Sequence, residues 1–204
     1  MPPPKKKGIY IILPTLALYI LIFILFLLTP FSDTFNFIIR FGALFGFTSM
    51  FIATMMTPFV VQLYKIFGKP FIKIHHLYSI TGLILITLHP VAFAISVVDI
   101  IVFVPDFSSW YGFWSLGGRL ALILIYIAVL AALLRKNVTK YWRIIHALNY
   151  VALFLAYIHG VLIGSDFQNI SILIIFTVMI ILSFGVLIFK RYLTYKRKKQ
   201  KRKK

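Results

Sequence analysis

The chain has 204 residues, of which 61% are hydrophobic, and it carries 22 lysines and arginines against four acidic residues. Soluble domains are nearer half apolar, so this composition predicts an integral membrane protein with several spans. Because there is no cysteine, disulfides, thiolate-ligated or covalently attached haem, and cysteine-held iron–sulfur clusters are excluded. A strongly basic run directly follows the last apolar stretch, which favours contact with anionic lipid headgroups over nucleic-acid binding.

Six apolar stretches are long enough to cross about 30 Å of hydrocarbon as helices. We therefore expect an all-α integral membrane protein, a single-domain bundle of six transmembrane helices. The expected spans are about 8–29, 36–64, 71–98, 116–135, 142–164 and 168–190. The first has the basic flank of a signal peptide, but its apolar run of about 20 residues is too long for one, so we expect a retained span. Pro58 and Pro90 lie inside spans and predict kinks.

The charges predict the orientation of the bundle. The basic residues gather at one set of span ends, and the four aspartates gather at the other set. The positive-inside rule then places both termini, including a basic tail at 191–204, in the cytoplasm. This orientation indicates a multi-pass protein of the cytoplasmic membrane.

All five histidines lie in two of these apolar stretches, where an ionisable group is costly and is a functional hypothesis by default. His75 and His89 are fourteen residues apart, which puts them about 40° apart on one helical face and about 21 Å apart along the axis. His146 and His159 are thirteen apart, and an ideal helix would turn them about 140° from each other. We therefore expect a bend or a π-bulge between these two.

Two histidines on each of two spans is the arrangement that holds two haems between helices, because neutral imidazole is a common haem ligand. His76 competes with His75 for the inner position, but adjacent residues point about 100° apart and helix geometry favours His75. Gly82 lies midway between His75 and His89, and a glycine there lets a flat macrocycle approach the backbone. Motifs for other metal and nucleotide chemistry, such as HExxH, Walker A and GxGxxG, are absent.

Taken together, the six spans and the two histidine pairs resemble the ferric reductase-like transmembrane domain family. The resemblance covers roughly residues 36–190, and it includes the basic, tryptophan-containing approach at Lys140–Arg143 and the Thr57-Pro58 step before a basic loop. That family includes the haem-bearing membrane halves of NADPH oxidases and ferric reductases and a stand-alone bacterial branch, MsrQ.

The resemblance implies that His75 with His146 ligates the iron of an inner haem b, and that His89 with His159 ligates an outer one. MsrQ-type chains tend to have arginine at the place of His75, so a single haem is the alternative to two. Arg40 lies a few residues into the second span, where a haem propionate would offset the cost of its charge. Snorkelling to the outer headgroups is the competing interpretation.

These expectations describe an oxidoreductase subunit, a membrane cytochrome b that carries electrons to an outer acceptor. No segment is long or polar enough for a flavin or nicotinamide domain, so we expect electrons from a separate flavoprotein reductase, a loosely bound flavin or membrane quinol. The outer acceptor would be ferric iron, oxygen or a reductase partner, the last as in MsrQ. The alternative is a haem-free polytopic transporter, or an assembly or scaffold subunit that docks through its basic tail.

Overall fold

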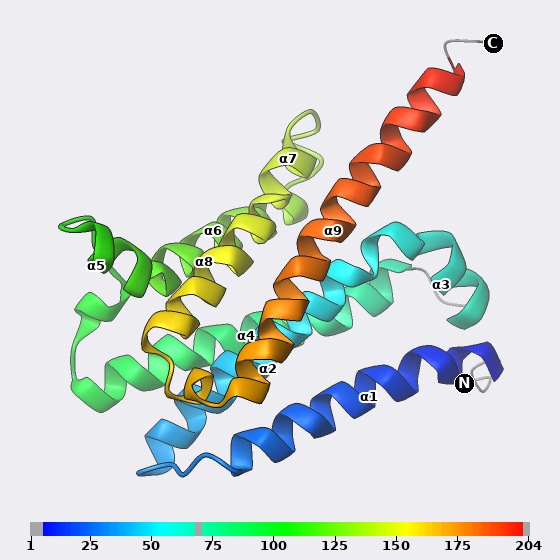
Figure 1. Cartoon of the computed structure of the whole chain (residues 1–204). Helices are drawn as coiled ribbons and strands as arrows, with labels where there is room; N and C mark the ends of the chain where they lie inside the picture. The colour runs from blue at the N-terminus through cyan, green and yellow to red at the C-terminus, as the bar shows by residue number, and fades with distance from the viewer. Residues whose placement is uncertain (1–5, 68–70, 202–204) are drawn as a thin grey trace.

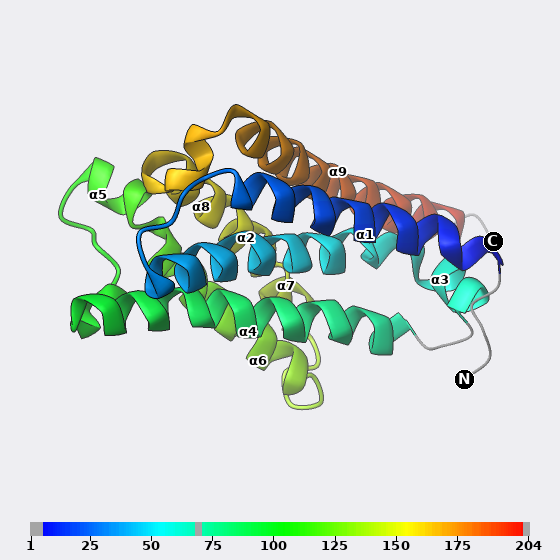
Figure 2. The ribbon, with the colours of Figure 1, turned by 90° about the horizontal axis from the view of Figure 1, so that it is seen from below.

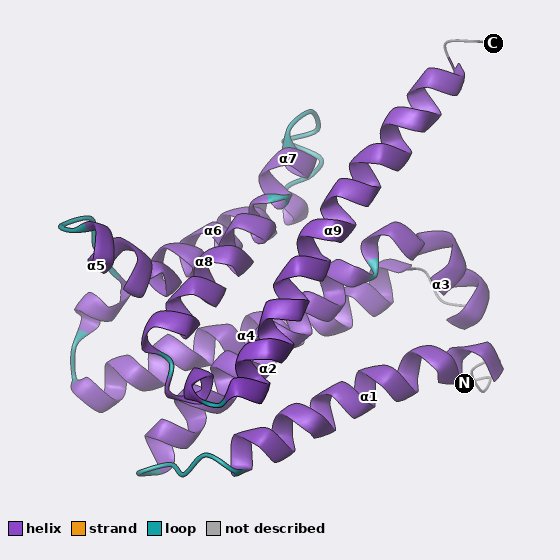
Figure 3. Cartoon of the chain, in the orientation of Figure 1, coloured by secondary structure: helices purple, strands orange, loops and turns teal. Residues whose placement is uncertain are grey.

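A computed structural model describes residues 6–67 and 71–201, and every regular element in those ranges is a helix (Figure 3). The long helices are α1 (Lys6–Leu27), α2 (Thr34–Met55), α4 (Phe71–Val97), α6 (Gly117–Leu133), α8 (Leu148–Ile163) and α9 (Ile170–Lys201). Short α-helices are α3 (Val60–Phe67), α5 (Trp110–Ser115) and α7 (Trp142–His146), and single 3-10 turns are η1 (Thr57–Phe59), η2 (Ile100–Phe103) and η3 (Ser165–Gln168). The all-α prediction is confirmed.

Four helical stretches are long and apolar enough to cross a membrane, namely Thr34–Phe67, Lys73–Val97, Trp142–Ile163 and Ile170–Lys196. The other two expected spans correspond to shorter apolar helices, Ile11–Leu27 and Gly117–Leu133. Large apolar side chains are exposed along the outside of these helices, among them Leu77, Ile80 and Ile84 on α4. Such surfaces suit contact with lipid, which agrees with a membrane protein. Six crossings and cytoplasmic termini stay predictions.

The second expected span is broken at Pro58. α2 ends at Met55, η1 contains Pro58, and α3 then begins at Val60. Proline has no N–H to donate and its ring crowds the preceding turn, so it weakens or kinks a helix at that point. The span expected over 36–64 is thus one helical stretch, Thr34–Phe67, with a 3-10 turn at Pro58, where a kink was predicted. Pro90, in contrast, lies inside α4.

The fifth expected span is broken just after its first histidine. α7 ends at His146, and α8 begins at Leu148. Between them the Ala147 N–H donates to the Ile144 carbonyl, and the Tyr150 N–H donates to the Ala147 carbonyl. Both bonds span three residues, as in a 3-10 turn. This tighter turn is the bend that the thirteen-residue spacing of His146 and His159 predicts.

The last helix is longer than expected. α9 has 32 residues, about 48 Å at 1.5 Å per residue, and it runs on past the predicted end at 190. Figure 1 shows its C-terminal part projecting beyond the other helices. The basic residues that follow Phe189 are therefore carried on a helix as far as Lys201.

The two most extensive helix–helix interfaces are antiparallel, α2 with α4 and α6 with α8. Figure 2 shows α2 lying between α1 and α4, and α9 packs against both α2 and α8. Glycines allow α2 and α4 to approach closely. A Cβ atom on Gly42 would lie 2.8 Å from the Leu85 carbonyl oxygen, and one on Gly46 would lie 2.8 Å from the Ile86 nitrogen.

Candidate functional site

Four of the five histidines form two facing pairs between the helix pairs. His75 of α4 faces His146 at the end of α7, with ring centroids 6.3 Å apart and planes at 72°. His89 of α4 faces His159 of α8, with centroids 6.2 Å apart and planes at 74°. The structure thus brings together the partners that the family resemblance implies.

The Nδ1 atom of each of these histidines lies within hydrogen-bond distance of a backbone carbonyl oxygen. The Nδ1 atom of His75 lies 3.2 Å from the Ala53 oxygen, and that of His89 lies 2.9 Å from the Ile39 oxygen. On the other side, Nδ1 of His146 lies 3.0 Å from the Ala128 oxygen, and Nδ1 of His159 lies 2.5 Å from the Ser115 oxygen. A carbonyl oxygen only accepts, so each neutral ring carries its proton on Nδ1 and presents Nε2 as the basic nitrogen. Metal-binding histidines show this same arrangement.

The carbonyls repeat the spacing of the histidines they hold. Ile39 and Ala53 are fourteen residues apart on α2, as are His89 and His75 on α4. Ser115, at the end of α5, and Ala128, in α6, are thirteen apart, as are the histidines on α7 and α8. The α2–α4 pair therefore keeps one register that supports a histidine at both ends, and on the other side α5 and α6 support the histidines of α8 and α7 with matching spacing.

The separation within each pair fits two imidazoles on opposite sides of one metal ion. A metal–imidazole bond is about 2.0–2.1 Å, and with about 1.1 Å from each nitrogen to its ring centre the centroids would be about 6.3 Å apart. The observed 6.3 and 6.2 Å agree with this value. No group of three or more His or Asp side chains that could hold a bare ion occurs in the described parts of the chain. A macrocycle that supplies its own equatorial nitrogens needs only two protein ligands, so haem fits these residues.

A cavity of about 510 Å³ lies at the outer pair. Cavities of 300–1,000 Å³ are typical of ligand-binding sites. His89 and His159 line it together with apolar side chains from both helix pairs, such as Phe47 and Leu153. Polar residues line it as well, and they include Asn36, Arg40 and Asp166.

Because Gly118 has no side chain, the ring of His159 can pack directly against α6. A Cβ atom on Gly118 would lie 2.8 Å from Cδ2 and 3.0 Å from Nε2 of His159. Such contacts are shorter than side chains tolerate, so any larger residue would displace the imidazole. The sequence analysis did not single out this glycine, and its only local signal is the Gly117-Gly118 pair at the start of an apolar helix.

The two competing histidines of α4 have different surroundings. His75 is partly buried and faces His146, whereas His76 is exposed. The ring of His76 lies 6.1 Å from that of His75 on the same helix. Of these two neighbours, His75 is the one that the structure directs toward the other helix pair.

In the structure Gly82 lies against α2. A Cβ atom on Gly82 would lie 2.8 Å from Cγ of Met50 and 3.1 Å from its backbone nitrogen. Gly82 therefore faces α2 and permits close packing of α2 on α4. The need for a glycine at this position comes from helix packing, and contact with a macrocycle is not required to explain it.

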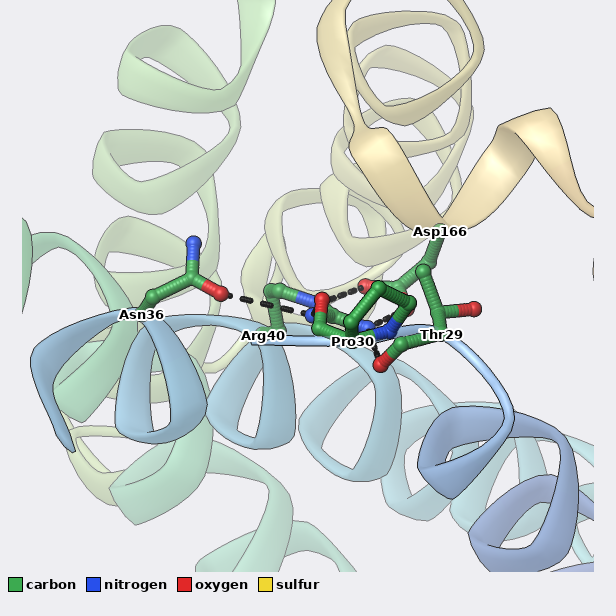
Figure 4. Close-up of polar contacts among 5 residues, drawn as sticks. All are labelled: Thr29, Pro30, Asn36, Arg40 and Asp166. Carbon is green, nitrogen blue, oxygen red and sulfur yellow. Dashed lines mark hydrogen bonds and ion pairs between the residues drawn. The ribbon is translucent and has the colours of Figure 1, made fainter. Parts of the chain in front are cut away.

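The guanidinium of Arg40, for which a propionate contact was expected, makes hydrogen bonds within the protein with all of its N–H groups (Figure 4). Nε and Nη2 donate to the two carboxylate oxygens of Asp166 at 3.0 and 2.7 Å. Nη2 also donates to the Thr29 carbonyl, and Nη1 donates to the Pro30 carbonyl and to Oδ1 of Asn36. These contacts use all five N–H donors of an arginine. Snorkelling is excluded, since the Arg40 side chain is only 6% exposed.

One polar side chain beside the inner pair was not anticipated. Asn149 donates from Nδ2 to the backbone oxygen of His146 at 3.0 Å. Its Oδ1 atom is buried and has no hydrogen-bond partner. Asparagine three residues after a histidine is too common to be recognised from sequence.

No family model matches the chain, and comparisons with curated proteins and with solved structures found no match.

Proposed function

We propose that this protein is a ferric reductase-like membrane cytochrome b that carries electrons across the cytoplasmic membrane. The observation that supports this most directly is that four histidines form two facing pairs at two depths, and that Nδ1 of every one of them lies at a backbone carbonyl oxygen. The ring separations of 6.3 and 6.2 Å are compatible with bis-imidazole ligation, and a carbonyl at Nδ1 is the usual support of a metal-binding histidine.

In this proposal His75, His146, His89 and His159 hold the iron of two haems b through Nε2. Their Nδ1–H bonds to backbone carbonyls fix the ring orientation and raise the basicity of the ligating nitrogen. Bound haem supplies a one-electron redox couple at each pair. About 21 Å of helix rise separates His75 from His89, which is a large part of the roughly 30 Å hydrocarbon thickness.

The six spans, with both termini in the cytoplasm, belong to the same proposal. The inner pair then lies toward the basic, cytoplasmic side, where a flavoprotein reductase, a loosely bound flavin or a quinol would deliver electrons. The basic surface suits an acidic donor protein by charge complementarity. The outer pair would deliver electrons to ferric iron, oxygen or a reductase partner.

The test is a dithionite-reduced minus oxidised spectrum of the purified full chain, with pyridine haemochrome quantification per chain. Two haems b per chain are expected. One haem would restrict the proposal to a single histidine pair, as in the MsrQ pattern. A protein that stays colourless after haem reconstitution would overturn the proposal and favour a transporter or a scaffold subunit. Deleting residues 196–204 would then identify a scaffold if it abolished assembly of a larger complex.

A further inference from the structure

The Arg40–Asp166 ion pair joins α2 to the segment that follows α8, at the outer end of the two helix pairs. Arg40 is on α2, and Asp166 is in η3, directly after α8. Both side chains are 6% exposed, and the carboxylate is engaged by two guanidinium nitrogens. It is the one ion pair among the side chains that the structure describes. A bidentate arginine–carboxylate pair fixes orientation as well as distance.

Arg40 also fixes the segment that precedes α2. It bonds to the carbonyls of Thr29 and Pro30 after α1, and its guanidinium lies 5.2 Å from the centre of the Phe26 ring. One side chain therefore ties together the end of α1, the first turns of α2 and the α8–α9 connection, as the close-up in Figure 4 shows for the polar contacts. These contacts leave the guanidinium little freedom to move.

Both partners are linked to the outer histidine pair, Arg40 through its neighbour Ile39 and Asp166 through α8. Arg40 follows Ile39, whose carbonyl accepts the Nδ1–H of His89. Asp166 comes seven residues after His159, and both charged residues line the cavity that contains the two histidines. The ion pair thus connects the support of one imidazole to the helix that carries the other.

We propose that Arg40 and Asp166 are positioning residues that set the separation of His89 from His159. The haem part of this inference rests on the proposed function, but the separation does not. When one partner of a buried ion pair is removed, an uncompensated charge remains, whereas replacing both with apolar residues is far better tolerated. This difference separates a loss of positioning from a loss of folding.

The first experiment measures the separation without haem. Because the chain has no cysteine, spin labels at Ser96→Cys on α4 and Gln168→Cys in η3 report the outer gap by pulsed EPR. Labels at Lys73→Cys and Lys140→Cys report the inner end; all four positions are exposed. In Asp166→Asn and in the double variant Arg40→Met with Asp166→Leu, the outer distance should lengthen and broaden while the inner distance stays unchanged.

The second experiment measures the outer haem. Both variants should retain it about 10- to 100-fold less tightly, the usual loss when support of a metal ligand is removed. Its remaining fraction should shift toward a high-spin spectrum, and the inner haem should be unaffected. Tyr157→Phe is the matched control, since it removes a hydrogen bond of 2.7 Å to Thr177 that joins α8 to α9 and leaves the ion pair intact.

An unchanged outer distance and outer haem spectrum in the folded double variant would overturn the inference. So would equal changes at both ends, or loss of the folded protein in every variant, because the ion pair would then be a general folding contact. If the wild-type chain holds no haem, the proposed function fails, and the EPR distances still decide the positioning role.

Discussion

His89 and His159 face each other with ring centroids 6.2 Å apart, although seventy residues separate them in the sequence. They come from different helix pairs, and a different carbonyl holds each ring from behind. The inner pair repeats this arrangement with its own carbonyls. The two pairs are therefore separable by mutation.

His89→Ala or His159→Ala should remove the outer haem alone, about half of the total, because a bis-histidine site fails when either ligand is lost. His75→Ala or His146→Ala should remove the inner haem alone. Pyridine haemochrome quantification per chain measures both losses. His76→Ala is the control, since that side chain is exposed. A loss with His76→Ala equal to that with His75→Ala would refute the assignment of the inner ligand.

Gly118→Ala should weaken retention of the outer haem about 10- to 100-fold, because its methyl group would occupy the place of the His159 ring. The neighbouring Gly117→Ala is the control, since its Cβ atom would make only ordinary contacts, 3.4 Å or longer, with Leu155. Haem titration of the two purified variants makes the comparison. Identical titration curves would show that the ring has room to move.

Gly42→Ala should destabilise the protein by about 1–3 kcal/mol, the usual cost of overpacking. Its Cβ atom would meet the backbone of Leu85, which cannot move aside as a side chain can. Gly185→Ala is the control, because nothing lies within 4 Å of the added Cβ atom and alanine favours the helix. Thermal unfolding in detergent would decide, and equal melting temperatures for the two variants would contradict close packing of α2 on α4.

Val98→Gly should stabilise the end of α4 by about 1 kcal/mol, because Val98 has φ 53°, a left-handed conformation that is costly for a β-branched residue. The Asp99 N–H bonds to Ala94 and the Val98 N–H to Ile95 in the usual helix-ending pattern, in which glycine is preferred. Val97→Gly, one residue earlier and within α4, should instead destabilise the helix. Melting temperatures that fall in both variants would show that the turn does not need positive φ.

Asp33 should make the stability of α2 depend on pH. Its carboxylate accepts the N–H of Asn36 at 2.9 Å and the hydroxyl of Ser32 at 2.8 Å, and these bonds, the first above all, lower its pKa below the ordinary 3.8. A lowered carboxyl pKa contributes stability that is complete above 3.8 and is lost as the pH falls through the folded value.

The melting temperatures of wild type and Asp33→Asn, followed from neutral pH to below 3.8, should therefore converge on acidification. Asparagine can still cap the helix, but it does not titrate in this range. A difference between the two proteins that does not change with pH would exclude the carboxylate as the source.

Hydropathy and proline positions predict much of the fold. The apolar runs locate α1, α4 and α6 closely, and the 3-10 turn between α2 and α3 contains Pro58, where a kink was predicted. The extension of α9 was missed because a change from apolar to basic residues marks a membrane boundary without ending a helix. Lysine and arginine are good helix formers, so α9 continues to Lys201.

The candidate site was only partly predictable. Histidine spacing indicates which rings share a depth, and the poor thirteen-residue spacing correctly indicates the bend at Ala147. The carbonyls that hold the rings have no signature, because every residue has a carbonyl. The partner of Arg40 was missed because Asp166 lies 126 residues away, and local patterns carry no information about such a pairing.

The shared register of carbonyls and histidines has a mechanical consequence. Sliding α4 along α2 by one residue would withdraw the Ala53 carbonyl from His75 and the Ile39 carbonyl from His89 in the same movement. A change in the register of α4 on α2 would thus alter the orientations of His75 and His89 together, whereas a change at one ring's own neighbours, such as Gly118 beside His159, acts at one depth alone. Any chemical difference between the two ends of this protein has to arise from what surrounds each pair of rings.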